Sequence, residues 1–262
     1  MSYGTVQAEK MTTESGYSLG AGNASSFKNR IINGGMTIDQ RNAGATVNNP
    51  AASSQYTLDR WQIYGDNANA FRVAQSTPGS LPAGYSMGVQ IYSLTATAIS
   101  SGSLYIFRQK IEGYNTADLS WGTANAKTVT LSFWVYSSLT GTYGGALQNN
   151  DGTRSYPFTY SVSSANTWTQ ISVTVSGDTS GTWNTTTGIG IAVVFGLGAG
   201  STYSGTAGAW ASANYYSATG ATNFVSTNSA TMYLTGVQLE VGTVATSFDY
   251  RPYGTELQLC ER

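Results

Sequence analysis

The chain contains 262 residues with a formal net charge of −1; only 10% of the residues are charged, while 40% are hydrophobic. This apolar share is sufficient for a hydrophobic core, and the near-neutral charge excludes the basic surface that binding to nucleic acid or anionic lipid requires. The chain has no histidine, which excludes the most common general base, the most common metal ligand and the catalytic triads built on histidine. Neutral glycans or other proteins are therefore the expected partners, and binding to nucleic acid is not expected.

Residues 1–30 differ in composition from the rest of the chain. The segment 6–14 is polar with weak periodicity, and the segment 16–22 is spaced by glycine, as in a flexible linker. Such a segment cannot bury enough apolar surface to fold alone. It is either a disordered leader or an arm that becomes ordered when it binds another protein. We predict an attachment arm over residues 1–30 and one folded domain over residues 31–262.

The domain reads as a series of short strands. Segment 129–135 places Val, Leu, Phe and Val at every second position, which is the period of a half-buried strand, and segment 170–175 alternates in the same way. Segment 188–195 is almost continuously apolar, which is typical of a central strand covered on both faces. No apolar stripe of helical length is evident. The pattern predicts an all-β fold, an antiparallel β-sandwich of the jelly-roll type with an extended N-terminal arm.

The last expected strand changes phase at Gly236. The apolar residues of segment 231–235 occupy one phase and those of segment 237–241 occupy the other. A β-bulge at Gly236 restores a single inward face, because one extra residue shifts the register by one. We therefore expect the inward row after the bulge to be core, and the aromatic residues beyond it to form a strap over the edge of the sandwich: Val237, Leu239 and Val241, then Phe248, Tyr250 and Tyr253.

Motifs for catalysis are scarce. The glycine-rich segments 141–145 and 196–200 lack the strand, turn and helix context of a nucleotide-binding site. Several carboxylates are available in principle for the acid pair of a glycoside hydrolase, but none forms a pair at a recognisable spacing: Asp39, Asp59, Asp66, Asp118, Asp151, Asp178, Asp249, Glu112 and Glu240. We therefore expect no catalytic residue, no cofactor and no enzymatic activity.

The single cysteine, Cys260, stands two residues before the end of the sequence. It has no partner for an internal disulfide, so we expect an inert thiol, with an intermolecular bridge as the alternative. A single cysteine is typical of a protein that folds in a reducing cytoplasm, and the first residues lack the apolar run of a signal peptide. No segment approaches the roughly 18–20 continuous apolar residues of a membrane-spanning helix, so we expect no membrane insertion.

Aromatic residues are abundant, with 18 tyrosines and 6 tryptophans, and both types serve sugar stacking and protein interfaces. Trp61, Phe133 and Trp168 stand within or beside expected strands and are predicted to be core. Four others lie in segments rich in Gly, Ser and Asn and are the candidate ligand-binding residues: Trp183, Trp210, Tyr215 and Tyr216. Loop packing, a subunit interface and a glycan platform stay open for them. As a glycan platform, the two tryptophans would contribute more to recognition than to thermal stability.

Five short segments share a pattern with a known group of proteins. They are 28–36 (Lys-Asn-Arg-Ile-Ile-Asn-Gly-Gly-Met), 38–42 (Ile-Asp-Gln-Arg-Asn), 56–61 (Tyr-Thr-Leu-Asp-Arg-Trp), 236–242 (Gly-Val-Gln-Leu-Glu-Val-Gly) and 248–257 (Phe-Asp-Tyr-Arg-Pro-Tyr-Gly-Thr-Glu-Leu). Together they resemble the distal modules of bacteriophage tail fibres and related virion surface proteins, especially those of phages that infect cyanobacteria. The resemblance implies a virion protein built on a jelly roll like that of carbohydrate-binding modules.

The resemblance implies several further properties. Jelly rolls of this kind often carry a structural calcium ion near the chain ends, for which Asp249 and Glu240 are the candidates, against ordinary turn and edge carboxylates. Fibre-tip modules are usually threefold, so we expect a homotrimer. We also expect a location on the virion surface after synthesis in the host cytoplasm, with attachment to other virion proteins through residues 1–30.

Three functions stay open from the sequence. The preferred one is a non-enzymatic tail fibre or receptor-binding adhesin that recognises host cell-surface glycan through loop aromatics and amides. The second is a capsid decoration protein, either a cement or a head-fibre protein. The third is a polysaccharide depolymerase, which requires a groove with an acidic pair that the sequence does not show.

Overall fold

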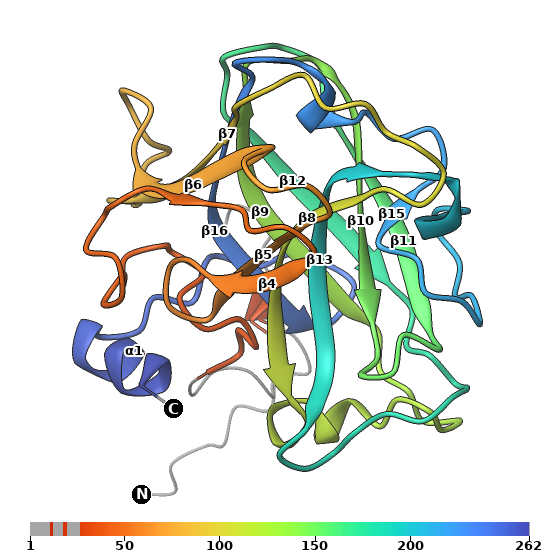
Figure 1. Ribbon diagram of the computed structural model, residues 1–262. Helices are drawn as coiled ribbons and strands as arrows, with labels where there is room; N and C mark the ends of the chain where they lie inside the picture. The colour runs from red at the N-terminus through yellow and green to blue at the C-terminus, as the bar shows by residue number, and fades with distance from the viewer. Residues whose placement is uncertain (1–10, 13–17, 20–26, 262) are drawn as a thin grey trace, which may run out of the picture.

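The computed structural model describes residues 11–12, 18–19 and 27–261. Two antiparallel sheets of six strands each lie face to face and enclose the main hydrophobic core (Figure 1). This is the antiparallel β-sandwich of the jelly-roll type that the strand pattern predicts. Most of the arm expected over residues 1–30 lies outside the described residues; within them, β1 (Met11–Thr12) pairs with β2 (Ser18–Leu19).

Each sheet takes its name from one of its inner strands. The β8 sheet has the order β11-β10-β13-β8-β5-β4, with β4 (Ser53–Tyr56), β5 (Trp61–Gly65), β8 (Leu104–Glu112), β10 (Gly141–Gln148), β11 (Ser155–Val162) and β13 (Ile189–Ala199). The β9 sheet has the order β12-β9-β16-β7-β6-β3, with β3 (Val47–Asn48), β6 (Phe71–Ser76), β7 (Gly88–Ser93), β9 (Val129–Ser137), β12 (Thr169–Val175) and β16 (Thr231–Val241).

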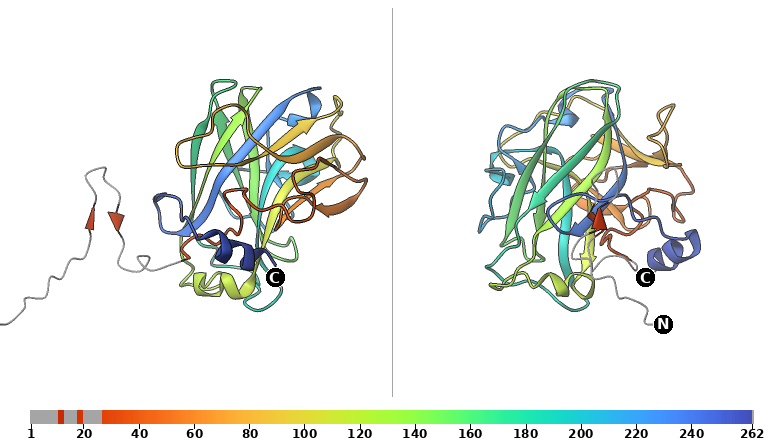
Figure 2. Two further views of the ribbon diagram at one scale, coloured as in Figure 1. Left: turned by 90° about the vertical axis from the view of Figure 1, so that its left-hand side faces the viewer. Right: turned by 180° about the vertical axis from the view of Figure 1, so that it is seen from behind.

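The remaining elements are short and lie in the connections between strands or, for the helix, after the last strand. They are the 3-10 helices η1 (Gly113–Asn115), η2 (Ala117–Leu119), η3 (Ser201–Tyr203) and η4 (Phe224–Ser226), the strands β14 (Ser204–Gly205) and β15 (Ser217–Ala218), and the helix α1 (Tyr253–Cys260). The two views in Figure 2 show the sheets from other sides, with α1 lying outside both of them.

Alternating side chains from both sheets build the core. Trp61 of β5 stacks on Phe107 of β8 with ring centroids 4.7 Å apart, and Phe133 of β9 meets Phe195 of β13 edge-on at 5.1 Å. Aromatic pairs in these geometries add about 0.5–1.5 kcal/mol each beyond the burial of their area. The prediction that Trp61 and Phe133 are core residues is confirmed, since both are almost fully buried.

Strand β13 is covered on both faces, as its continuous apolar run predicts. Val193 and Phe195 point into the main core. On the outer face Val194 joins a smaller buried cluster with Ile106, against which tyrosines such as Tyr203 pack. A strand buried on both sides needs apolar residues at every position, which explains why this segment does not alternate.

The phase change in the last strand is a β-bulge, as predicted. The pairing of β16 with β9 shifts register between Thr235 and Gln238. Between them Gly236 has a φ of 61°, a left-handed conformation that glycine adopts without steric cost. Leu234 before the bulge and Leu239 after it are both 0% exposed. The extra residue therefore keeps a single apolar face turned toward the core.

The segments that carry the phage resemblance meet in space. The Asn29 amide donates a hydrogen bond to the carbonyl of Val237 at 3.0 Å, and the backbone N–H of Val237 donates to the carbonyl of Gly34 at 2.9 Å. A Cβ atom at Gly34 would lie 2.1 Å from the Val237 oxygen, so the approach requires glycine. The indole N–H of Trp61 donates to the carbonyl of Asn33 at 3.1 Å. These contacts brace the sandwich, so the shared segments are structural.

Arg251 anchors the C-terminal segment to the start of the domain. Its guanidinium donates to the backbone carbonyls of Asn29 and Ile31 and forms an ion pair with Glu256 at 3.0 Å. Planar guanidinium groups suit such convergent contacts because their five N–H donors are held in one fixed fork. The contacts with Asn29 fix the chain to the sandwich already before residue 31.

The helix α1 is an addition to the all-β fold that the strand pattern did not indicate. It follows Pro252, spans eight residues and buries Cys260, whose apolar neighbours are Ile32 and Ile38. A helix this short shows no sustained apolar stripe, which is why periodicity misses it. Tyr253 begins this helix and is 63% exposed, so it does not continue the strap as expected. Within the described residues no helix is long and apolar enough to cross a membrane.

Trp168 corrects a second prediction, because it is not a core residue. It lies partly exposed just before β12, with its ring 5.6 Å from that of Tyr136. Its indole N–H donates to the carbonyl of Ser80 at 2.9 Å. The ring therefore covers the outer face of the β9 sheet. The sequence shows that Trp168 lies next to a strand, but it does not show whether the ring lies on the inner or the outer face of the sheet.

Candidate functional site

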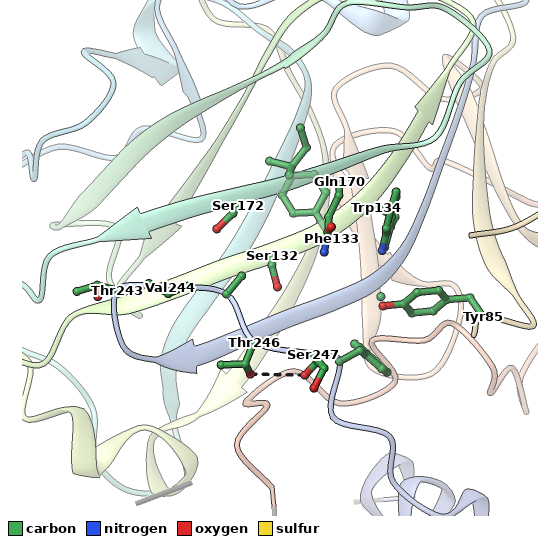
Figure 3. A pocket seen from close by; sticks show the side chains of 14 residues that line it. Tyr85, Ser132, Phe133, Trp134, Gln170, Ser172, Thr243, Val244, Thr246 and Ser247 are labelled. Carbon is green, nitrogen blue, oxygen red and sulfur yellow. Dashed lines mark hydrogen bonds between the residues drawn. The ribbon is translucent and has the colours of Figure 1, made fainter. Parts of the chain in front are cut away.

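A trench of about 460 Å³ lies on the outer face of the β9 sheet (Figure 3). Outward side chains of β9 and β12 form its floor. One wall is the segment 243–248, which folds back after β16, and another contains Tyr85 from the connection before β7. The trench therefore combines a rigid sheet surface with two irregular segments that come from distant parts of the chain.

The floor is an ordered grid of side chains. In the antiparallel register Trp134 of β9 stands opposite Gln170 of β12, and Ser132 stands opposite Ser172. Directly opposite residues on one face of a sheet have Cβ atoms roughly 4.5–5.5 Å apart. An indole and an amide, followed by two hydroxyls, are thus presented side by side. Because the backbone hydrogen bonds of the sheet hold their Cα atoms, this arrangement is preformed.

Tyr85 closes one end of the trench. Its ring lies over Gly236, where a Cβ atom would be 2.6 Å from two ring carbons and from the hydroxyl oxygen, so the glycine that makes the bulge also makes room for this ring. Figure 3 shows the hydroxyl of Tyr85 turned toward Trp134. Burial and the neighbouring Tyr250 raise the pKa of Tyr85 to about 12, with a hydrogen bond from Trp134 opposing them. The hydroxyl is therefore neutral at physiological pH and able to donate a hydrogen bond.

The wall formed by segment 243–248 is fastened by a buried carboxylate. Glu240 is 0% exposed and accepts hydrogen bonds from the backbone N–H of Thr246 at 2.8 Å, the Thr246 hydroxyl at 2.7 Å and the Gln238 amide at 2.8 Å. The ammonium group of Lys28 donates to the carbonyl of Ser247 at 2.6 Å. A buried carboxylate with this many donors is satisfied, so the wall is held in place.

Glu240 and Asp249, the candidates for a calcium ion, do not fit such a site. The oxygens of Glu240 are engaged by N–H and O–H donors, and Asp249 accepts from the backbone N–H of Asn29 at 3.2 Å and lies 3.7 Å from the guanidinium of Arg251. Calcium requires six to eight oxygen ligands gathered around one point. In the described part of the chain, no group of three or more His, Cys, Asp or Glu residues is placed to hold a metal ion.

The lining of the trench is uncharged. Among the 14 residues that line it, none is acidic or basic; they are aromatic, amide, hydroxyl and small apolar residues. Pockets that pair apolar surface with a few fixed polar groups orient small ligands, and Gln and Ser side chains both donate and accept hydrogen bonds. The trench therefore suits a neutral ligand that has hydroxyl groups on its edges and apolar C–H faces, as a sugar ring has.

Aromatic residues continue across the same face of the sheet. Tyr136 lies next but one to Trp134 on β9, and its ring is 5.6 Å from those of both Trp168 and Tyr233. The amide of Gln90 on β7 donates to the hydroxyl of Tyr233. The partly exposed rings extend the trench into a longer amphipathic surface. A ligand of several sugar units would find aromatic and amide groups along this surface.

Trp183 and Trp210, two of the four residues predicted to bind a ligand, meet each other and Trp121. The three ring centroids are 4.7, 5.3 and 5.4 Å apart, with interplanar angles between 76° and 81°. Trp121 is buried, and the other two rings are partly buried against the main core. We call these three residues the tryptophan cluster. Its rings stand edge to face, so they do not present one flat surface.

The indole N–H groups of the tryptophan cluster are all used within the protein. Trp121 donates to the carbonyl of Lys127 at 2.8 Å, Trp183 to that of Ser180 at 3.2 Å, and Trp210 to that of Ser176 at 2.7 Å. Each of these hydrogen bonds fixes the backbone of a loop to one ring of the cluster. This geometry favours loop packing among the interpretations that the sequence left open for Trp183 and Trp210.

Tyr215 and Tyr216 lie in a different place, over the outer face of the β8 sheet. The Tyr215 ring lies against Gly205, where a Cβ atom would be 2.2 Å away. Tyr216 is partly buried and meets Tyr203 edge-on at 5.6 Å. It also lines a small depression beside Arg108. The four predicted site residues therefore do not form one site.

The residues of the trench escaped sequence-based prediction, although a signal was present. Trp134 and Tyr136 occupy the outward phase of a strand whose inward phase is apolar. Large aromatic residues in the phase that normally carries polar residues indicate a functional outer face. Tyr85 and the segment 243–248 carried no such signal, because their position depends on how loops fold back over the sheet.

Comparisons with known proteins add similarities of fold. No protein-family model matches the sequence, and no curated protein matches it. The enzymatically active domain of tailspike protein 4 of bacteriophage CBA120 is similar with a TM-score of 0.44 and 10% identity, over 82% of this chain and 22% of that one. A structure described as CBM4 gives a TM-score of 0.43 and 18% identity, over 81% and 99%. TmCBM61 in complex with beta-1,4-galactotriose gives a TM-score of 0.38 and 12% identity, over 82% and 100%.

All three TM-scores are below 0.5, so no site residue is transferred from these structures. The chain spans 22% of the tailspike structure, so the activity named for that domain is not carried over either. The assignment of the fold rests on the two sheets of this chain.

Proposed function

We propose that the chain is a non-enzymatic bacteriophage virion protein, a tail fibre or receptor-binding adhesin that binds a neutral glycan of the host surface. The observation that carries the glycan part is the uncharged trench in which Trp134 stands beside Gln170 and the Ser132–Ser172 pair. The indole offers an apolar face to the C–H groups of a sugar ring. The amide and hydroxyls offer partners to its hydroxyl groups.

The arrangement of carboxylates supports binding without hydrolysis. A glycosidase requires two carboxyl groups flanking the scissile bond, and the described residues place no carboxylate in the lining of the trench. Asp178, a buried carboxylate elsewhere, forms an ion pair with Arg154 at 2.6 Å. Glu240 is occupied by its three donors. These groups are better placed to hold loops than to transfer protons to a ligand.

The virion part of the proposal is supported by the resemblance of five segments to phage tail-fibre modules. In this proposal residues 1–30 attach the chain to another virion protein, and three copies form the appendage. Mass measurement of the purified protein tests the trimer, and a strictly monomeric protein in solution and on the particle contradicts it. Cryo-electron microscopy of the particle tests its position, and density on the capsid rather than on the tail overturns the tail-fibre assignment.

A glycan array tests the binding proposal, with wild-type protein and the variant Trp134→Ala compared on the same slides. The expected result is binding to one class of neutral glycan. The affinity of the variant should be reduced about tenfold or more, because the variant lacks the apolar contact between the indole and the sugar ring. Tyr114→Ala is the control, because Tyr114 is 57% exposed and lies away from the trench in η1. Equal binding by wild type and Trp134→Ala contradicts the assignment of the site.

A further inference from the structure

Two cations stand next to each other on the outer face of the β8 sheet, on the other side of the sandwich from the trench. Arg108 and Lys110 are two residues apart on β8, and both side chains point outward from the β8 sheet, because the residues between and beside them, Phe107, Gln109 and Ile111, are buried on the inner face. The chain has only 12 Lys and Arg residues in 262. Two adjacent like charges on one strand repel each other, so an opposite charge is expected near them.

Within the described residues, neither cation forms an ion pair. Arg108 donates to the side-chain oxygen of Gln62 at 3.4 Å and to the hydroxyl of Ser54 at 2.9 Å, both neutral groups. Among the described residues Lys110 has no hydrogen-bond or ion-pair partner. Burial lowers the pKa of both groups, and the charge of Arg108 lowers that of Lys110 further. Both cations are therefore partly desolvated without compensation, a cost that a bound anion would offset.

The two cations line two adjoining hollows, which together we call the depression; Lys110 lines both and Arg108 lines the smaller one. A hollow of about 310 Å³ beside Tyr56 and another of about 150 Å³ beside Tyr216 share Lys110 and Ile189 in their linings. Tyr56 is 44% exposed, and Tyr216 is partly exposed. The smaller hollow is further lined by the amides of Gln148, Asn149, Asn150 and Asn214. The depression therefore combines aromatic rings, residues with amide side chains and the two cations.

Two carboxylates also line the depression, and each has another partner. Glu112, two residues beyond Lys110 on β8, forms an ion pair with Arg60 at 2.7 Å. Asp151 at the far rim accepts a hydrogen bond from the amide of Asn150 at 2.7 Å. With Arg60, Arg108 and Lys110 against Glu112 and Asp151, the residues that line the depression carry a net charge of +1, although the chain as a whole has a net charge of −1.

We propose that this depression is a second carbohydrate site, in which Arg108 and Lys110 bind the carboxylate or sulfate group of an acidic polysaccharide. Guanidinium and ammonium groups donate charge-assisted hydrogen bonds to such oxyanions. The rings and amides around them match the faces and hydroxyls of the sugar. A nucleic acid is a poor fit, because its binding usually relies on several phosphate contacts spread over a basic surface. The site is on the other sheet from the trench, so the proposal does not depend on Trp134.

Matched pairs of charged and neutral polymers test this proposal. Titration calorimetry of the whole chain at physiological salt compares dextran sulfate with dextran, and oligogalacturonate with its methyl ester. The expected result is binding of one acidic polymer, with little or no binding of its neutral counterpart, and the pair that responds distinguishes sulfate from carboxylate. Lys110→Gln and Arg108→Gln should each weaken binding about tenfold or more, whereas Lys110→Arg should retain it.

Three controls keep the test specific. Lys127→Gln removes the same charge from an exposed side chain elsewhere and should leave binding unchanged, as should Trp134→Ala, which tests the other site. Melting curves should show that every variant is folded. The proposal is overturned if neutral and acidic polymers bind equally, if Lys127→Gln weakens binding as much as Lys110→Gln, or if duplex DNA or polyglutamate displaces the acidic polysaccharide at equal concentration of charge.

Discussion

Replacing Trp210 by alanine should destabilise the sandwich by about 2–4 kcal/mol. The Trp210 ring makes edge-to-face contacts with Trp121, Trp183 and Tyr156 at 5.3, 5.4 and 5.3 Å, each contributing about 0.5–1.5 kcal/mol. Its hydrogen bond to the carbonyl of Ser176 at 2.7 Å contributes about 0.5–1.5 kcal/mol. These contributions add to about 2–6 kcal/mol, and because the ring is partly exposed we take the lower part of that range.

Thermal unfolding followed by circular dichroism measures this effect. For a domain of this size 1 kcal/mol corresponds to about 2–4 °C in Tm, so Trp210→Ala should melt roughly 5–15 °C below the wild type. Tyr114→Ala removes an aromatic ring that is 57% exposed and should change stability by no more than about 0.5 kcal/mol. If Trp210→Ala had the same melting temperature as the wild type and instead lost glycan binding, the ring would be a recognition platform and the reasoning from its packing would be wrong.

Further predictions concern the core and the buried titratable groups. Leu239→Ala should cost about 2–5 kcal/mol in a denaturant titration, because Leu239 is 0% exposed; a loss below about 1 kcal/mol would show that the bulge does not set the inward face. Burial raises the pKa of the Cys260 thiol to about 12, so the folded protein should not react with a thiol reagent at pH 8, and stoichiometric labelling without unfolding would contradict its burial. Burial also raises the pKa of Tyr85 to about 12 and that of Tyr160 above its ordinary value. A raised tyrosine pKa in the folded state favours the protonated form, so this contribution to stability is present below pH 10 and decreases as the pH rises toward 12; a melting temperature that stays constant over this range would refute it.

Local periodicity was sufficient to predict β9, β12, β13 and β16, together with the bulge. In β9 the inward row at every second position follows directly from the sequence. In β16, which is buried on both faces, Gly236 marks the position where the apolar phase changes. Periodicity fails where the position of a residue depends on contacts between segments that are distant in the sequence or on which face of a sheet a side chain lies. Helix α1 is too short to show a stripe, and Trp168 lies beside a strand but on its outer side.

The candidate site was beyond sequence reasoning for a related reason. The trench exists because the segment 243–248 folds back over β9 and Tyr85 lies over Gly236, and neither event leaves a periodic signal. The loop tryptophans attracted attention because their neighbours are small and polar. Their rings instead pack together from positions 121, 183 and 210, an arrangement that no local pattern encodes.

The most direct test of the central claim is a crystal structure of the chain with the neutral oligosaccharide selected on the glycan array. The account predicts a sugar ring against the indole of Trp134, with its hydroxyls hydrogen-bonded to Gln170 and to the Ser132–Ser172 pair. Sugar density on the tryptophan cluster or beside Lys110, with the trench empty at saturating ligand, would contradict it.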